Sequence, residues 1–346
     1  MLSLPVVSSG FPMWNDRPNP TRREVLAGAV AVAMAPVIFS GAEARAADVE
    51  NPLIIDTHQH LWDPAKAMQP TIEKVAGAHR PNYGPVEYDE ATRGLNVKAV
   101  YMEVDSPADQ RAAEAEYAIG LCHDRTQATI AAVIGAWPDD PAFAAFINRF
   151  KPSGVVRGIR QVLHASTTPR GMCLKDEFVR GIQFLGKQEL SFDLCMRPAE
   201  LSDGLKLSHL CPDTRFIVDH CGNADPVAFL AHPPAGLKPT HDAEVWKRDM
   251  AALAKRHNVI CKISGIVARA PEMWSAEMLA PIVDHCLDSF GPDRVVFGGD
   301  WPICLKRTSL GNWIEALKQI VAPRPVAEQR KLWAENAMKW YKLAVR

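Results

Sequence analysis

The stretch Ile54-Ile55-Asp56-Thr57-His58-Gln59-His60 is a short apolar run that ends in two histidines two positions apart. In an extended chain, that spacing places both imidazoles on the same face. If the strand lies in a barrel and that face is the interior, His58 and His60 can converge on one ion or one substrate oxygen. Isolated histidines are usually core or surface residues, so the meaning of this pair depends on the rest of the chain.

Further runs rich in β-branched residues follow, separated by segments with helical spacing or by turn residues. Most are continuous apolar runs without strict alternation, which is typical of parallel strands covered on both faces. Together with the first run they give eight predicted strands, at 53–58, 97–104, 129–136, 155–162, 191–196, 216–219, 259–263 and 294–297.

The segments between the predicted strands are long enough for crossover helices. Eight such units in roughly 250 residues predict an α/β fold of the (β/α)8 TIM-barrel class. A doubly wound open sheet is the alternative, but no GxGxxG follows the first strand to support it. Helical spacing is clearest at 108–124, 141–150, 242–257 and 275–290.

Two long segments rich in proline and glycine follow predicted strands, at 64–92 after the first strand and 224–240 after the sixth. We expect both to be loops over the barrel mouth, because loops at the carboxyl ends of barrel strands build the active site. The tail at 313–341 is predicted to form two helices that cover the barrel.

Two further polar residues stand where predicted strands finish. His220 follows Phe216-Ile217-Val218-Asp219, and Asp300 follows Val295-Val296-Phe297-Gly298-Gly299. A barrel brings these ends to the same mouth as His58 and His60. Imidazole nitrogens and a carboxylate suit zinc or a similar divalent ion, and a carboxylate beside a held water suits a general base. The alternatives are a structural His220 bonded to backbone and an Asp300 that caps the next helix.

These residues resemble the amidohydrolase-related TIM-barrel hydrolases, and most closely the branch that contains sugar lactonases such as fuconolactonase. Pyrone-dicarboxylate and muconolactone hydrolases belong to the same branch. The likeness covers about 53–341, and it is carried in order by Asp56-Thr57-His58-Gln59-His60, Gly158-Ile159-Arg160, Phe192-Asp193-Leu194, Val218-Asp219-His220-Cys221-Gly222, Cys261-Lys262-Ile263-Ser264-Gly265 and Phe297-Gly298-Gly299-Asp300-Trp301-Pro302.

The resemblance implies hydrolysis of a lactone or similar cyclic ester, with Asp300 activating water and His58, His60 and His220 around it. Strands four and five offer no lysine that could bridge two metal ions. Strand five, Phe192-Asp193-Leu194-Cys195-Met196, also lacks the histidine of many one-metal members. The expectation is therefore one zinc-like divalent ion, or catalysis without metal as in some members of the branch.

Other polar residues near the predicted mouth are candidates for binding substrate. Arg160 in strand four and Arg197 after strand five offer planar guanidinium groups that suit a carboxylate or a developing oxyanion. His164 and Glu103 could contact substrate hydroxyls or hold a water. The alternative for each arginine is a structural salt bridge, and Lys262 within strand seven is as easily structural.

Two other functions remain open from the sequence. A non-oxidative decarboxylase of an aromatic acid would use the same barrel, and a periplasmic sugar-acid binding protein would keep the barrel without catalysis. The set of three histidines and one aspartate argues against the second, because binding alone does not need a carboxylate placed for proton transfer.

Composition argues against nucleic acid and an acidic membrane surface as partners. Lys and Arg number 39 against 40 Asp and Glu, so no broad field is available to gather nucleic acid or to hold an acidic membrane. The chain has eight cysteines but no CxxC pair, and Cys195, Cys221 and Cys261 lie in apolar runs. We interpret most of them as small core residues rather than as a disulfide framework.

The first residues have the order of an export signal. Thr21-Arg22-Arg23-Glu24-Val25-Leu26 precedes a moderately apolar run to Phe39 and the small-x-small pattern Ala44-Arg45-Ala46. The run is short of the roughly 20 apolar residues of a membrane-spanning helix. We expect 1–46 to be a signal read by the twin-arginine export machinery and cleaved near Ala46, which leaves 47–346 as a periplasmic or otherwise exported barrel domain. Met13 is an alternative start.

Overall fold

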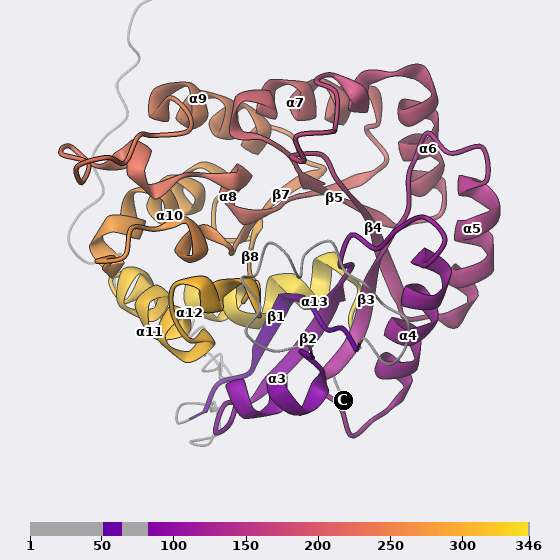
Figure 1. The fold of residues 1–346 in the computed structure, drawn as a ribbon, viewed down its shortest axis with the longest axis horizontal. Helices are drawn as coiled ribbons and strands as arrows, with labels where there is room; N and C mark the ends of the chain where they lie inside the picture. The colour runs from indigo at the N-terminus through magenta and orange to yellow at the C-terminus, as the bar shows by residue number, and fades with distance from the viewer. Residues whose placement is uncertain (1–50, 64–81, 345–346) are drawn as a thin grey trace, which may run out of the picture. The chain divides into compact units, whose positions relative to one another are not determined.

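Eight parallel strands lie side by side in sequence order in the computed structural model, which describes residues 51–63 and 82–344 (Figure 1). Every neighbouring pair is parallel. This order excludes the doubly wound alternative, in which the strand order reverses. The strands are β1 (Ile54–Gln59), β2 (Val97–Met102), β3 (Thr129–Gly135), β4 (Val156–Val162), β5 (Ser191–Cys195), β6 (Arg215–Val218), β7 (Val259–Ile263) and β8 (Val295–Phe297).

Beyond the end of β8, the chain meets the end of β1 and nearly closes the barrel. The backbone N–H of His60 donates to the carbonyl of Trp301 at 2.8 Å, and Gln59 forms a parallel bridge with Trp301. The side chain of Thr57 also donates to the carbonyl of Phe297 at 2.6 Å. The predicted TIM-barrel class is confirmed, and each predicted strand overlaps an observed one with boundaries shifted by at most two residues.

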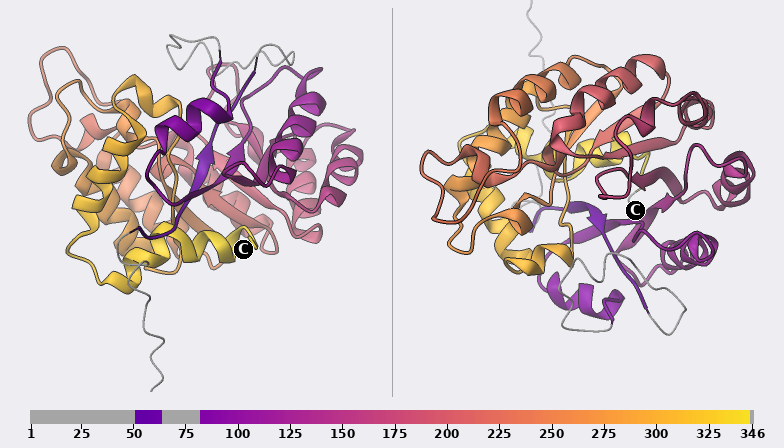
Figure 2. Two further views of the ribbon diagram at one scale, coloured as in Figure 1. Left: turned by 90° about the horizontal axis from the view of Figure 1, so that it is seen from below. Right: turned by 45° about the horizontal axis from the view of Figure 1, so that its top comes forward.

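Helices surround the barrel and cover its outer face (Figure 2). The apolar core between strands and helices is the larger of two buried clusters. The predicted helices at 108–124, 141–150, 242–257 and 275–290 are confirmed with small shifts at their ends. The α-helices are α3 (Pro85–Ala91), α4 (Arg111–His123), α5 (Phe143–Phe150), α6 (Asp176–Lys187), α7 (Leu201–Leu210), α8 (His220–Asn223), α9 (Ala243–Ala254), α10 (Ala276–Phe290), α11 (Leu310–Val321), α12 (Val326–Arg330) and α13 (Asn336–Trp340).

The second buried cluster lies inside the barrel, at the end where the strands begin. Ile55, Val100 and Ile260 point inward there and pack against Ala337 and Tyr341 at the end of the chain. The C-terminal helix thus closes this end, as the left view of Figure 2 shows. A π-helical turn, Lys331–Glu335, joins α12 to α13, so the tail contains α11 and one longer interrupted helix. Catalysis is consequently confined to the opposite end, where the strands finish.

The segment 64–92 is only partly described, and its described part is not a simple loop. Residues 85–91 form α3, because Pro85 suits the first helical position and Glu87 accepts from the backbone N–H of Gly84 at 2.9 Å. Tyr83 and Tyr88 then pack edge-on against Trp301, each with ring centroids 5.4 Å apart. The prediction of a loop throughout 64–92 is therefore wrong for α3. Residues 64–81 lie outside the described residues.

The predicted export signal at 1–46 also lies outside the described residues. Within residues 51–63 and 82–344, no helix has the length and apolar character needed to cross a membrane. All eight cysteines are free, and seven of them are buried, in agreement with their interpretation as core residues.

Candidate active site

Asp56 ties the two strand ends that carry the candidate catalytic residues. Its Oδ1 atom accepts from the backbone N–H of His58 at 2.9 Å and from that of Gly299 at 2.6 Å. The hydroxyl of Tyr88 donates to Oδ2 at 2.8 Å. Asp56 is buried and acts as a positioning residue, because one carboxylate fixes the end of β1 against the turn that leads to Asp300.

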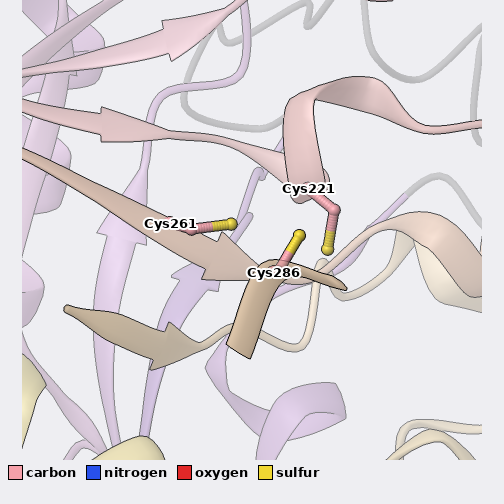
Figure 3. A group of neighbouring side chains, drawn as sticks. All are labelled: Cys221, Cys261 and Cys286. Carbon is pink, nitrogen blue, oxygen red and sulfur yellow. The ribbon is translucent and has the colours of Figure 1, made fainter. Parts of the chain in front are cut away.

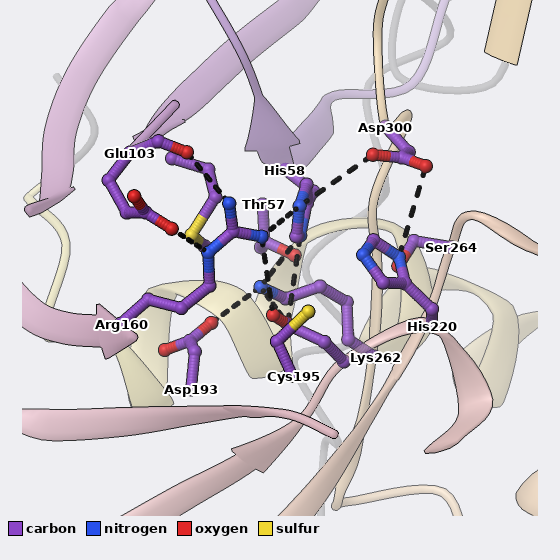
Figure 4. A network of polar contacts seen from close by, with 12 residues as sticks. Thr57, His58, Glu103, Arg160, Asp193, Cys195, His220, Lys262, Ser264 and Asp300 are labelled. Carbon is purple, nitrogen blue, oxygen red and sulfur yellow. Dashed lines mark hydrogen bonds and ion pairs between the residues drawn. The ribbon is translucent and has the colours of Figure 1, made fainter. Parts of the chain in front are cut away.

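His58 lies at the centre of a ring of charged side chains (Figure 4). Nη1 of Arg160 is 3.1 Å from Nε2 of His58, and Nζ of Lys262 is 3.2 Å from Nδ1. A guanidinium and an ammonium group can both only donate, whereas a neutral imidazole accepts through one nitrogen, so only one of these two contacts can be a hydrogen bond. Asp219 lies on the Nδ1 side at 3.6 Å. Burial and the charge of Lys262 lower the pKa of His58 well below its ordinary value, so the ring is neutral.

His60 and Asp300 face each other across the barrel mouth. The Nδ1 atom of His60 is 3.1 Å from the carbonyl oxygen of Met102, which can only accept, so Nδ1 carries a hydrogen. The Nε2 atom of His60 is 3.5 Å from Oδ1 of Asp300. A lone pair and a carboxylate oxygen at that distance repel unless a positive charge, either a proton or a metal ion, lies with them.

Asp300 stands in a backbone conformation that aspartate adopts at a cost. Its φ is 52°, in the left-handed region, and such strain gathers at functional sites. Burial raises the pKa of this carboxyl, but His220, His60 and His58 more than offset that effect, so the pKa of Asp300 lies below its ordinary value. Asp300 is therefore an ionised carboxylate only 4% exposed at the end of β8.

His220 completes the set from the end of β6, also with a left-handed φ of 54°. Its Nδ1 atom is 2.9 Å from Oγ of Ser264 and 4.0 Å from Oδ2 of Asp300. A side chain at Gly265 would place its Cβ 2.3 Å from that nitrogen, so glycine is required for the ring to sit here. Burial lowers the pKa of His220 to about 4, which leaves the ring neutral at pH 7.

Arg160 and Glu103 form a buried pair beside the histidines. The Nε atom of Arg160 donates to Glu103 Oε1, and its Nη2 atom donates to the carbonyl of Glu103 at 2.7 Å. Both residues are 3% exposed. Arg160 also lines the cavity, whereas Glu103 does not. Glu103 instead fixes the position of the Arg160 side chain.

The cavity above these residues has a volume of about 320 Å³. Ligand sites commonly have volumes of about 300–1,000 Å³, so a small ring compound fits. Sequence reasoning missed two cations in its wall, Arg269 and Lys306, on the short 3-10 turns Ile266–Arg269 and Ile303–Lys306. Arg269 is fixed by Asn223, whose Oδ1 accepts at 2.7 Å. Neither turn carries a motif, so only the folded chain reveals them.

Of the two other residues that were predicted to bind substrate, one lines the cavity and the other does not. His164 lines the cavity, and burial lowers its pKa to about 4. Arg197 is not among the cavity residues. Its guanidinium instead donates to Glu200 Oε1 at 2.7 Å and to the carbonyls of Ala165 and Thr168 at 2.7 and 2.8 Å. These contacts correspond to the structural salt bridge that the sequence left as the alternative.

A layer of buried charge supports the site from within the barrel. Nζ of Lys262 is 2.6 Å from Oδ2 of Asp193 and 2.8 Å from Oδ1 of Asp219, and all three side chains are fully buried. The hydroxyl of Tyr341 donates to Asp193 at 3.2 Å. This network extends from the C-terminal helix to His58, so Lys262 is a positioning residue rather than a wall of the cavity.

Two groups at the mouth, which share His58, have ligand atoms that suit a metal ion, and the second of them adds Asp219 and His220. His58, His60 and Asp300 offer two ring nitrogens and a carboxylate oxygen within 4.8 Å of one another. Such a set, with a position left open, is typical of catalytic zinc sites. The lone pair of His60 that faces Asp300 suits an ion. Arg160 already contacts Nε2 of His58, so an ion would compete with the guanidinium for that nitrogen.

Comparison with known proteins places this arrangement in a family. The amidohydrolase family matches residues 55–343, and the chain belongs to it. The chain is similar to an L-fucono-1,5-lactonase of Burkholderia multivorans, with 27% identity over 301 residues that cover 84% of this chain and 96% of the relative. The predicted resemblance and the predicted hydrolase class are thereby confirmed.

Solved structures support the same fold. A crystal structure of an amidohydrolase from Burkholderia multivorans with bound zinc has a TM-score of 0.72 at 24% identity, and the match covers 84% of this chain and all of that one. A probable 2-pyrone-4,6-dicarboxylic acid hydrolase from Acinetobacter baumannii, with citric acid bound, has a TM-score of 0.63 at 17% identity, over 84% of this chain and 99% of that one.

Proposed function

We propose that this chain is a lactonase that opens a cyclic ester by attack of water activated by Asp300. The observation that carries the proposal is the position of an ionised carboxylate 3.5 Å from His60 and 3.7 Å from His58, at the mouth of a cavity large enough for a lactone. The similarity to an L-fucono-1,5-lactonase supports the same reaction class.

The reaction divides among the residues at the mouth. Asp300 takes a proton from water as the water oxygen bonds to the lactone carbonyl carbon, and the carbonyl oxygen becomes an oxyanion. Arg160 and the neutral His220 donate to that oxygen or orient it. When the intermediate collapses, the bond from the carbonyl carbon to the ring oxygen breaks, and Asp300 returns the proton to the ring oxygen. The product is a hydroxy acid.

For the metal, we propose at most one divalent ion, held by His58, His60 and Asp300. Such an ion would supply Lewis-acid polarisation of the carbonyl. The zinc bound to a structural relative supports this proposal, and the contact of Arg160 with His58 opposes full occupancy. The side chains, and not the ion, transfer the proton and orient the carbonyl group of the substrate.

The substrate that fits the cavity wall best is a lactone with a carboxylate or several acidic hydroxyls. Arg160, Arg269 and Lys306 face the cavity, and the acidic side chains of its wall are Asp105 and Asp300. Burial, followed by the charge of Glu103, raises the pKa of Asp105 to about 6, so this carboxyl loses its charge only as the pH falls below neutral, and at pH 7 the three cations outnumber the two carboxylates. The wall therefore favours an anionic group on the substrate.

A lactone panel tests the proposal directly. Hydrolysis is followed with a pH indicator for sugar-acid lactones, carboxylated lactones and uncharged lactones. We expect turnover of at least one charged lactone. Release of carbon dioxide from an aromatic acid without lactone turnover would instead establish the decarboxylase alternative, and tight sugar-acid binding without turnover would establish the binding protein.

We also propose that the enzyme acts outside the cytoplasm after twin-arginine export and cleavage near Ala46. The support is the sequence order of paired arginines, apolar run and Ala44-Arg45-Ala46. N-terminal sequencing of the protein isolated from the periplasmic fraction tests this proposal. A start at Met1 or Met13 in the mature protein would contradict it.

A further inference from the structure

Three cysteines from separate parts of the chain meet behind the active site. Cys221 comes from α8, Cys261 from β7 and Cys286 from α10, and their sulfurs lie within 4.8 Å of one another. Figure 3 shows the three thiols pointing toward a common centre. All three residues are fully buried. Inward and outward residues alternate along β7, so Cys261 points away from the barrel interior while Lys262 points into it.

This cluster differs from the ordinary packing of small core residues. The five other cysteines belong to no such group of three among the described residues. A buried free cysteine packs as a small hydrophobic residue, and metal binding is one of the properties that its sulfur adds to packing. Here three soft donors share one centre, and soft thiolate ligands select ions such as Cu(I) and zinc.

We propose that Cys221, Cys261 and Cys286 form a binding site for a soft monovalent metal ion of the Cu(I) class. The number of donors favours this class over zinc. A structural zinc site is almost always tetrahedral with four ligands, and the described cluster has three. Cu(I) is stable with two or three soft ligands, so the three sulfurs suffice.

The backbone at Cys221 gives the site a second role. His220, Cys221, Gly222 and Asn223 all have positive φ values, from 52° to 67°. Such strained conformations persist only when their surroundings hold them. An ion bound to Cys221 would anchor this segment to β7 and α10, and would thereby fix the catalytic ring of His220 next to it.

The test uses the full mature chain, purified and handled without oxygen. Cu(I) is added from a competing chelator to the folded protein and, because the sulfurs are closed to solvent, also during refolding from urea. Copper per chain is measured after desalting, and X-ray absorption identifies the neighbouring atoms. The variants are Cys286→Ala, which removes one donor far from the catalytic residues, and Cys173→Ala, a matched control at a buried cysteine outside the cluster.

We expect one copper per chain with sulfur neighbours in wild type and in Cys173→Ala. Cys286→Ala should lose affinity by more than the roughly 10–100-fold that loss of an outer-shell partner costs. Copper should raise the Tm of wild type but not that of Cys286→Ala, because an ion that binds only the native state stabilises it. Equal binding in both variants, copper with nitrogen and oxygen neighbours only, or preferential retention of zinc on these sulfurs would overturn the proposal.

Discussion

The Nη1 atom of Arg160 lies 3.1 Å from the Nε2 atom of His58, and that nitrogen is also 3.7 Å from Oδ1 of Asp300. A metal ion at the mouth would have to bind the same nitrogen that the guanidinium faces. Arg160 is held in place by Glu103, so it cannot turn away without breaking a buried ion pair. Arginine and ion therefore compete for His58.

Removing the guanidinium should strengthen metal binding. We expect Arg160→Met to bind zinc about tenfold more tightly than wild type, or better, since both the competing donor and its positive charge are lost. Competition with a chromogenic chelator measures the affinity. Arg160→Lys is the matched control because it keeps the charge beside Glu103, and it should gain less. Unchanged or weaker zinc binding in Arg160→Met would show that the two do not compete.

The cations in the cavity wall should determine which lactones bind well. We expect Lys306→Met to raise KM for a carboxylated lactone about tenfold, because a charge-assisted contact contributes about 1.5–3 kcal/mol. The KM for an uncharged lactone should not change. Lys318→Met on α11, whose lysine pairs with Glu315 outside the cavity, is the control. Equal effects on both lactones would remove Lys306 from substrate recognition.

Lys262 should contribute to stability far more than an exposed lysine does. Lys262→Met leaves Asp193 and Asp219 buried without their cation, and breaking a buried pair in this way costs about 3–5 kcal/mol. Tyr341→Phe removes one hydrogen bond to Asp193 and should cost about 1 kcal/mol. Urea unfolding measures both. A Lys262→Met variant as stable as wild type would contradict the support role.

The free energy of unfolding should fall as the pH is lowered, in part because of His164. Its pKa is lowered from an ordinary value of 6.5 to about 4 in the folded chain, chiefly by burial. Between those values the unfolded state binds more protons, so this contribution is complete above about pH 6.5 and is lost as pH falls toward 4.

The test compares wild type with His164→Gln at pH 7 and pH 5. Each pKa unit corresponds to about 1.4 kcal/mol, so wild type should lose roughly 1–2 kcal/mol more than the variant over this interval. Urea midpoints at the two pH values give the difference. The same loss in both proteins would assign the acid sensitivity to other groups.

The sequence predicted the barrel well because its strands are buried on both faces and read as continuous apolar runs. The same pattern located His58, His60, His220 and Asp300, since each directly follows or ends such a run. The prediction of a loop throughout 64–92 missed α3, which starts with Pro85 at its first position and with Glu87 accepting from the backbone N–H of Gly84. Short helices at the mouth have too few residues for a periodic signal.

The roles of the arginines and the lysine around the site could not be predicted in the same way. Arg197 and Arg160 both stand near strand ends, and only their partners separate them: Glu200 and two carbonyls fix the first, whereas the second reaches the cavity and His58. Arg269 and Lys306 reach the cavity from short turns without a motif. Distances between side chains far apart in sequence decide these roles, and no local pattern encodes them.

The central claim is that Asp300 moves the proton, and Asp300→Asn tests it most directly. Asparagine keeps the shape of the side chain but cannot accept a proton from water. With the lactone that the panel identifies, kcat should fall by about 10²–10⁴-fold, the usual contribution of a general base, while KM and the circular dichroism spectrum stay close to those of wild type. An Asp300→Asn enzyme with undiminished kcat would contradict the account.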